Sequence, residues 1–79
     1  MDIKTQYLTY LPYNKKARIV SIEGGRGFQQ KLQVMGIREG QKIMIISRQP
    51  FRGPITVAVG GCQMTLGRGM ANKIIVEAI

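Results

Sequence analysis

Side chains that usually carry chemistry are few in this chain of 79 residues. Histidine, the commonest general base and metal ligand, does not occur in the sequence. The carboxylates are scattered along the chain, at Asp2, Glu23, Glu39 and Glu77. This separation does not predict the paired carboxylates that acid–base catalysis requires.

The single cysteine, Cys62, is the one soft nucleophile in the sequence. It has no base close to it in sequence and falls on the expected core face of a strand, so we interpret it as an inert thiol. A metal site would require Cys62 to converge with Glu23 or another carboxylate, which the spacing does not predict. We therefore expect no catalytic residue, no metal ligand and no cofactor, and a protein that is not an enzyme.

A cluster of glycines, Gly24-Gly25-Arg26-Gly27, precedes an apolar helical pattern. Backbone N–H groups at such a helix start could bind an anion, but the spacing matches neither a P-loop nor a dinucleotide fingerprint. The preferred interpretation is conformational, because glycine permits a sharp entry into the helix. Phosphate binding stays open as the alternative.

The charge balance points to acidic partners. Twelve Lys and Arg residues against four Asp and Glu give a net charge of +8, which favours nucleic acid, an anionic membrane surface or an acidic protein face. The basic residues are scattered, however, and the preferred interpretation of such a pattern is a solvated surface. No apolar run is long enough to span a membrane and no export signal is evident, so we expect a cytoplasmic location.

The elements expected to position these residues are one helix and five strands. Phe28, Leu32 and Met35 form one helical stripe, and Gly36 can end the helix in a left-handed conformation, so the spacing predicts a helix within 26–35. The predicted strands are 17–23, 41–48, 55–59, 62–66 and 73–77. In the first strand, both Ile19 and Ile22 are expected to face the core, which requires a bulge.

The clearest local pattern is a hairpin around Gly60-Gly61. A two-residue glycine turn pairs Val59 with Cys62, and the same register places alternate residues of 55–59 and 62–66 on one face. The apolar strand 41–48 is expected to be covered on its outer face by the helix.

The remaining segments are expected to be short turns. Leu8 and Leu11 predict one buried helical turn, and the tyrosines around them, Tyr7, Tyr10 and Tyr13, are expected to pack near the core. Asn14 predicts a turn, and residues 67–72 a single turn that carries Ala71. Together these elements predict one mainly β domain over 1–79, a small SH3-like barrel of about five antiparallel strands with one short helix between the first two strands.

Several of these segments resemble the FeoA family of small cytoplasmic proteins. The resemblance lies in the order and spacing of three blocks: Gly24-Gly25-x-Gly27 with Leu32-x-x-Met35-Gly36-Ile37-x-x-Gly40, then Pro50-x-x-Gly53-Pro54-Ile55, then Leu66-x-Arg68-x-x-Ala71. It implies an SH3-like barrel that accompanies FeoB, a ferrous-iron transporter and membrane GTPase. At the level of the family, it also implies a link to iron and to transition metal ion binding.

The resemblance suggests an accessory or regulatory protein of ferrous iron uptake that binds the cytoplasmic GTPase part of FeoB. The chain would then be peripheral to the membrane through its partner, with at most weak self-association. Loops and exposed helix faces are the expected contacts, which gives the candidate partner-binding residues Arg26, Gly27, Lys31, Phe51 and Arg52.

Two other function classes stay open. A basic SH3-like barrel could bind nucleic acid, although base-stacking aromatics are few and we expect no stable complex. The same domain type also occurs fused to iron-dependent repressors, so a soluble metal-responsive regulator is the second alternative.

Overall fold

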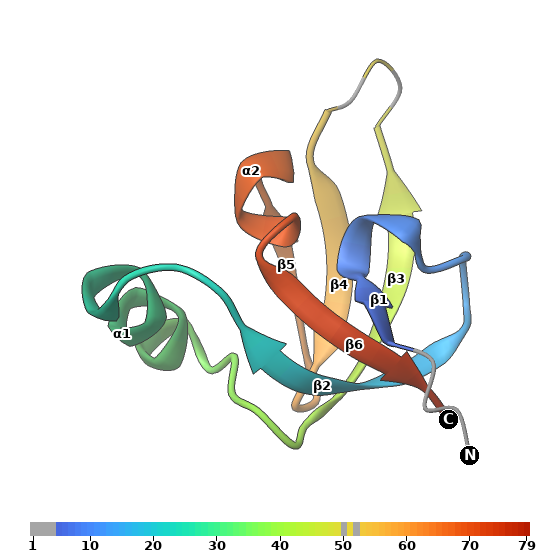
Figure 1. Ribbon diagram of the computed structural model, residues 1–79. Helices are drawn as coiled ribbons and strands as arrows, with labels where there is room; N and C mark the ends of the chain where they lie inside the picture. Colours follow the sequence, from blue (N-terminus) through green and yellow to red (C-terminus); the bar gives the residue numbers. More distant parts are fainter. Residues whose placement is uncertain (1–4, 50, 52) are drawn as a thin grey trace.

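An antiparallel sheet of six strands makes up most of the computed structural model, which describes residues 5–49, 51 and 53–79 (Figure 1). The strand order is β1-β6-β2-β3-β4-β5. The strands are β1 Thr5–Tyr7, β2 Lys16–Ile22, β3 Lys42–Arg48, β4 Ile55–Val59, β5 Cys62–Leu66 and β6 Ile74–Ala78. Three short helices join them: the 3-10 turn η1 Leu8–Tyr10, α1 Arg26–Met35 and α2 Arg68–Ala71.

The prediction of a small, mainly β antiparallel fold is confirmed, but two details of it were wrong. A sixth strand, β1, pairs with β6 through Thr5–Tyr7, and α2 is a second helix at the predicted turn around Ala71. As a result, α1 lies between the second and third strands rather than between the first two. Among the described residues, β1 and β5 are the two edges of an open sheet.

Register shifts bend this sheet around its core. The pairing of β2 with β6 shifts between Ile19 and Ser21, and both Ile19 and Ile22 are buried, so the predicted bulge is confirmed. A similar shift in β3 lies between Ile45 and Ser47. Aliphatic side chains from β2 to β6, η1 and both helices fill the resulting interior.

The β4–β5 hairpin has the predicted register, with Val59 opposite Cys62 and Ile55 opposite Leu66. The burial predicted for Cys62 was wrong, because its side chain is exposed. Cys62 begins β5 at the edge of the sheet, where only one side of the strand is paired, whereas its partner Val59 in β4 is buried. Its alternation with Leu66 is correct, but only Leu66 is deep enough in the sheet to be buried.

Helix α1 is held by its predicted stripe and ends at its predicted cap. Leu32 is fully buried, while Phe28 and Met35 are partly buried against the core. Gly36 has φ +96°, and the N–H of the following residue, Ile37, donates to the Leu32 carbonyl at 2.9 Å. Ile37 is buried as a result, so the chain leaves the helix by folding back on its last turn.

The N-terminal segment is only partly as expected. Leu8 and Leu11 are fully buried around η1, and Asn14 has φ +59°, so the predicted turns are confirmed. The packing predicted for the tyrosines was wrong for Tyr10 and Tyr13, which are 71% and 53% exposed. Tyr13 lies against a cation instead of the core.

That cation is Arg48 at the end of β3. Its guanidinium carbon lies 5.5 Å from the centre of the Tyr13 ring, and its Nη2 donates to the Leu11 carbonyl. The ring face of Tyr13 thus gives a cation–π contact to a partly buried guanidinium, whose Nε is buried without a hydrogen-bond partner among the described residues. The phenol ring therefore covers β3 from outside the core.

Gly24 provides a test of the turn that leads into α1. Its φ is +112°, and an added Cβ would lie 3.0 Å from the Phe28 ring, whereas a Cβ on Gly25 would meet nothing within 4 Å. Replacement Gly24→Ala should lower the free energy of unfolding by about 1–2 kcal/mol, measured by urea denaturation. Gly25 is the N-cap of α1, where alanine is also disfavoured, so Gly25→Ala should cost less than Gly24→Ala but more than nothing, and equal losses in both variants would contradict this account.

Candidate interaction surfaces

The described residues do not bring metal-ligating or catalytic side chains together. No group of three Cys, Asp or Glu residues in the described part of the chain could hold a metal ion. Cys62 and Glu23, the pair considered from the sequence, have separate surroundings. Cys62 lines a hollow with Met35 and Met64, whereas Glu23 is engaged by a tyrosine.

Glu23 accepts a hydrogen bond from the Tyr7 hydroxyl, which lies 3.0 and 3.1 Å from the two carboxylate oxygens. Tyr7 and Glu23 are far apart in sequence, so their contact joins β1 to the segment that follows β2. The hydrogen bond to Glu23, and then the negative charge of that carboxylate, raise the pKa of Tyr7 above its usual value.

Three of the predicted partner-binding residues lie together on α1. Arg26, Gly27 and Lys31 are all exposed, near the start and middle of the helix. The helix projects to one side of the sheet, so this surface faces solvent (Figure 1). One further residue belongs with them and was missed from the sequence: Val34 is 84% exposed.

Gly27, Lys31 and Val34 stand at i, i+4 and i+7, so they form one stripe along α1. We call these three residues, with Arg26, the α1 surface. The sequence does contain a signal for Val34, since it is an aliphatic residue that falls outside the apolar stripe of Phe28, Leu32 and Met35. An exposed valine beside the cationic side chain of Lys31 gives this stripe both apolar and charged character.

Local contacts fix the position of α1. The side-chain amide of Gln29 donates to the carbonyls of Ile22 and Gly24 at 3.0 and 3.1 Å. The Lys73 ammonium lies 4.9 Å from the centre of the Phe28 ring, which joins the helix to the segment before β6. The glycine turn thus serves the geometry of the helix start, in line with the conformational interpretation.

The loop between β3 and β4 carries the fourth candidate. Phe51 is 98% exposed and has φ +59°, an uncommon conformation for a residue with a side chain. Arg52, the fifth candidate, lies outside the described residues. The side chain of Phe51 thus has the exposure that a contact residue requires, and its role as a contact stays a prediction.

The structure does not bring the two sets of candidates together. The end of α1, with Met35 and Gly36, lies beside the Gly60–Gly61 turn, where β3 begins. Phe51 follows the other end of β3, a strand of seven residues that spans about 20 Å. The α1 surface and the Phe51 loop are therefore two separate surfaces.

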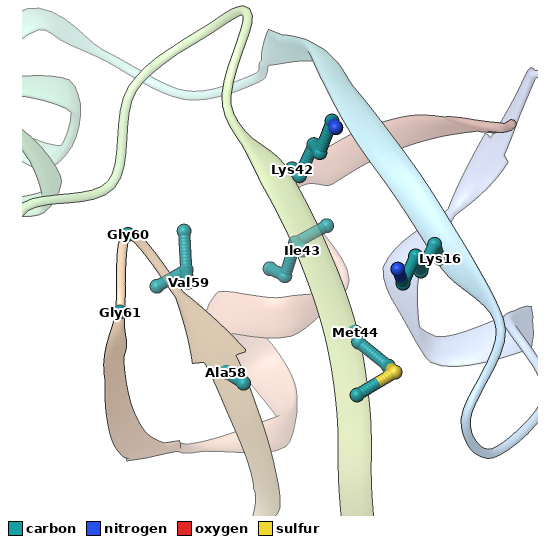
Figure 2. A pocket seen from close by; sticks show the side chains of 8 residues that line it. All are labelled: Lys16, Lys42, Ile43, Met44, Ala58, Val59, Gly60 and Gly61. Carbon is teal, nitrogen blue, oxygen red and sulfur yellow. The ribbon is translucent and has the colours of Figure 1, made fainter.

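The outer face of β3 is not covered by α1, and the prediction that it would be was wrong. Met44 lines an open hollow of about 210 Å³ on the side of the sheet away from the core, together with Lys16 of β2 and Ala58 of β4. Figure 2 shows Met44 between Ala58 and Lys16, with Lys42 further along β3. The helix is held at the side of the sheet instead, because its apolar stripe packs against the core there.

No helix in the described residues is long and apolar enough to cross a membrane.

Comparison with protein families finds a match over nearly the whole chain. The FeoA domain family matches residues 7–78. A curated protein of Methanocaldococcus jannaschii, provisionally named Fe(2+) transport protein A, is 34% identical over 70 residues, which is 89% of this chain and 83% of that protein.

Solved structures agree with this match. An iron uptake regulatory protein (FeoA) is 32% identical with a TM-score of 0.87, over 96% of this chain and 100% of that one. Iron(II) transport protein A from Clostridium thermocellum is 31% identical with a TM-score of 0.87, over 94% of this chain and 46% of that one. A manganese-dependent transcriptional repressor has a TM-score of 0.89 but is 19% identical, and this chain spans 44% of it, so it shares the fold alone.

The contact between Tyr7 and Glu23 predicts an alkaline titration. Because the Tyr7 pKa is raised, the stabilisation from this contact is present below the ordinary tyrosine pKa and is lost as pH rises through the raised value. The Tyr7 phenolate signal, taken as the difference in absorbance between wild type and Tyr7→Phe, should appear at lower pH in Glu23→Gln. An unchanged titration in Glu23→Gln would show that the contact does not form in solution.

Proposed function

Because this chain belongs to the FeoA domain family, we propose that it is a non-enzymatic accessory protein of ferrous iron uptake. The match over residues 7–78 is the observation that carries the proposal. A binding role is also consistent with the described surface, which presents exposed cationic and apolar side chains and no metal-ligating cluster among the residues placed.

The proposed partner is the cytoplasmic GTPase part of a FeoB-like membrane transporter. Binding it would place this chain in the cytoplasm, at the membrane only through its partner. A domain this small, with three described carboxylates and a net charge of +8, favours an acidic face on that partner. Whether binding changes GTP hydrolysis is a separate property that follows from the site of contact on the GTPase.

We assign the main contact to the α1 surface. Arg26 and Lys31 supply charge, and Val34 supplies an apolar centre that leaves water on binding. The helix is fixed to the sheet by Leu32 and Gln29, so little conformational freedom is lost in the complex. The Phe51 loop is a second, separate contact, whose aromatic side chain is suited to a pocket on the partner.

The two contacts can be tested separately. Arg26→Glu with Lys31→Glu should weaken binding to the purified cytoplasmic part of FeoB by about tenfold or more, measured by calorimetry. Phe51→Ala with Arg52→Ala should weaken it independently, so that the two losses add when the variants are combined. Neither variant should lower the melting temperature, because the side chains described are exposed.

A matched control keeps net charge from explaining the result. Lys15→Glu with Arg68→Glu changes the charge of the chain by the same amount away from both surfaces, and it should bind FeoB nearly as wild type does. Unchanged affinity in the α1 variant would remove the helix from the interface. Unchanged affinity in the loop variant would remove the loop.

The same variants separate the proposal from nucleic-acid binding. A salt titration of single-stranded oligonucleotide binding should show only weak, non-specific affinity. A steep linear fall of log affinity with log salt, together with no affinity for FeoB, would favour the nucleic-acid alternative.

A further inference from the structure

The outer face of the sheet carries a third surface feature, a hollow whose residues belong to neither the α1 surface nor the Phe51 loop. Its residues come from three neighbouring strands, and Lys16 pairs with Met44 while Met44 pairs with Ala58. These residues therefore stand side by side in one row across β2, β3 and β4 (Figure 2). We call the space they line, with Lys42, the Met44 hollow.

The rim of the Met44 hollow is cationic. Lys16 and Lys42 are exposed and lie on adjacent strands, and their partners across β2 and β3 are Met44 and Arg18 rather than carboxylates. The nearest carboxylate in the pairing is Glu77, opposite Arg18 on the far side of β2. Among the paired residues that the structure describes, the partners of these lysines and of Arg18 are therefore cationic or neutral apart from one carboxylate at the margin of the face, a balance that favours an anionic ligand.

The floor of the Met44 hollow is apolar. Met44 and Ala58 are partly exposed, and the buried Ile43 and Val59 also line the space, beside the backbone of Gly60. A volume of about 210 Å³ is below the roughly 300–1,000 Å³ of pockets that enclose small molecules. It suits one inserted side chain, and a methionine adapts readily to the shape of such a group.

The shape of this face distinguishes between anionic ligands. A membrane-binding surface requires apolar side chains that protrude into the lipid. Here Met44 and Ala58 are only partly exposed and lie in one row with Lys16, so the hollow presents no protruding apolar side chain to a flat bilayer. A protein segment can present both an apolar side chain and flanking carboxylates, which complements the apolar floor and the cationic rim.

We propose that the Met44 hollow is a docking site for an acidic peptide segment, which inserts one apolar side chain between Lys16 and Lys42. The flanking carboxylates of the segment lie against the two ammonium groups. This site is independent of the partner assigned to the α1 surface, since no residue is shared between the two.

The test uses a short synthetic peptide of aspartate and glutamate with one central leucine, added to the full isotope-labelled chain. Amide and methyl resonances of Lys42, Met44, Ala58 and Gly60 should shift on titration. Lys16→Glu with Lys42→Glu should weaken peptide binding by about tenfold. Replacing the central leucine with glycine should weaken it similarly, because the apolar floor then has nothing to bury.

Two controls make the result specific. Arg26→Glu with Lys31→Glu changes the net charge equally on the α1 surface, and it should leave peptide affinity nearly unchanged. Met44→Lys keeps the site cationic but fills its floor with a charge, so it should lose the preference for leucine over glycine. Melting curves of all variants confirm that each remains folded.

Several outcomes would overturn the proposal. Equal losses from both charge variants would show general electrostatic attraction, and equal affinity for the leucine and glycine peptides would show that the hollow is unused. Tighter binding to anionic phospholipid vesicles or to an oligonucleotide, with shifts at the same resonances, would assign the face to that ligand instead. Failure of FeoB binding leaves this test untouched, because the peptide assay does not include FeoB.

Discussion

The bend of the sheet is the constraint on which the rest of the structure depends. A chain this short can bury only about 60% of its unfolded surface, so nearly every aliphatic side chain must reach one interior. The shifts at Ile19 and Ile45 turn successive strands inward and let both ends of β2 and β3 contribute to it. Without them, Ile19 and Ile22 could not both be buried, since they lie three residues apart in a strand.

The demands of this small interior also explain why the outer face of the sheet stays uncovered. Leu32 of the apolar stripe and Ile37 just after α1 close the side of the interior. The helix therefore has no apolar face left to cover β3 from outside. The outer faces of β2, β3 and β4 therefore keep a mixed character, with Met44 among lysines. The family match identifies the type of domain and assigns no role to any one of these surfaces.

The sequence was informative where the determining interactions are local. The Gly60–Gly61 register, the cap at Gly36 and the bulge after Ile19 each follow from residues a few positions apart. The sequence failed where distant segments decide. Three residues of β1 carry no periodic signal and become a strand only because β6 offers an edge. The exposure of Cys62 depends likewise on the position of β5 at the edge of the sheet.

The sequence predicted the residues of the candidate site better than it predicted how they are arranged in space. Exposure of Lys31 and Phe51 was expected from composition, and the structure agrees. Their separation by the length of β3 could not be read from sequence, because it depends on which end of the sheet receives α1. Tyr13 was misjudged for the same reason, since its neighbour Arg48 is 35 positions away in the chain.

The separation of the α1 surface from the Phe51 loop lets this small domain make contacts at two distant places. Under the proposed function, binding of the partner at one end of the β3–β4 ladder would confine the other end close to that partner and raise its effective concentration there. Two individually weak contacts can then hold firmly as a pair through avidity, yet each can still release alone. A domain about 33 Å in its longest dimension can in this way connect two parts of one assembly.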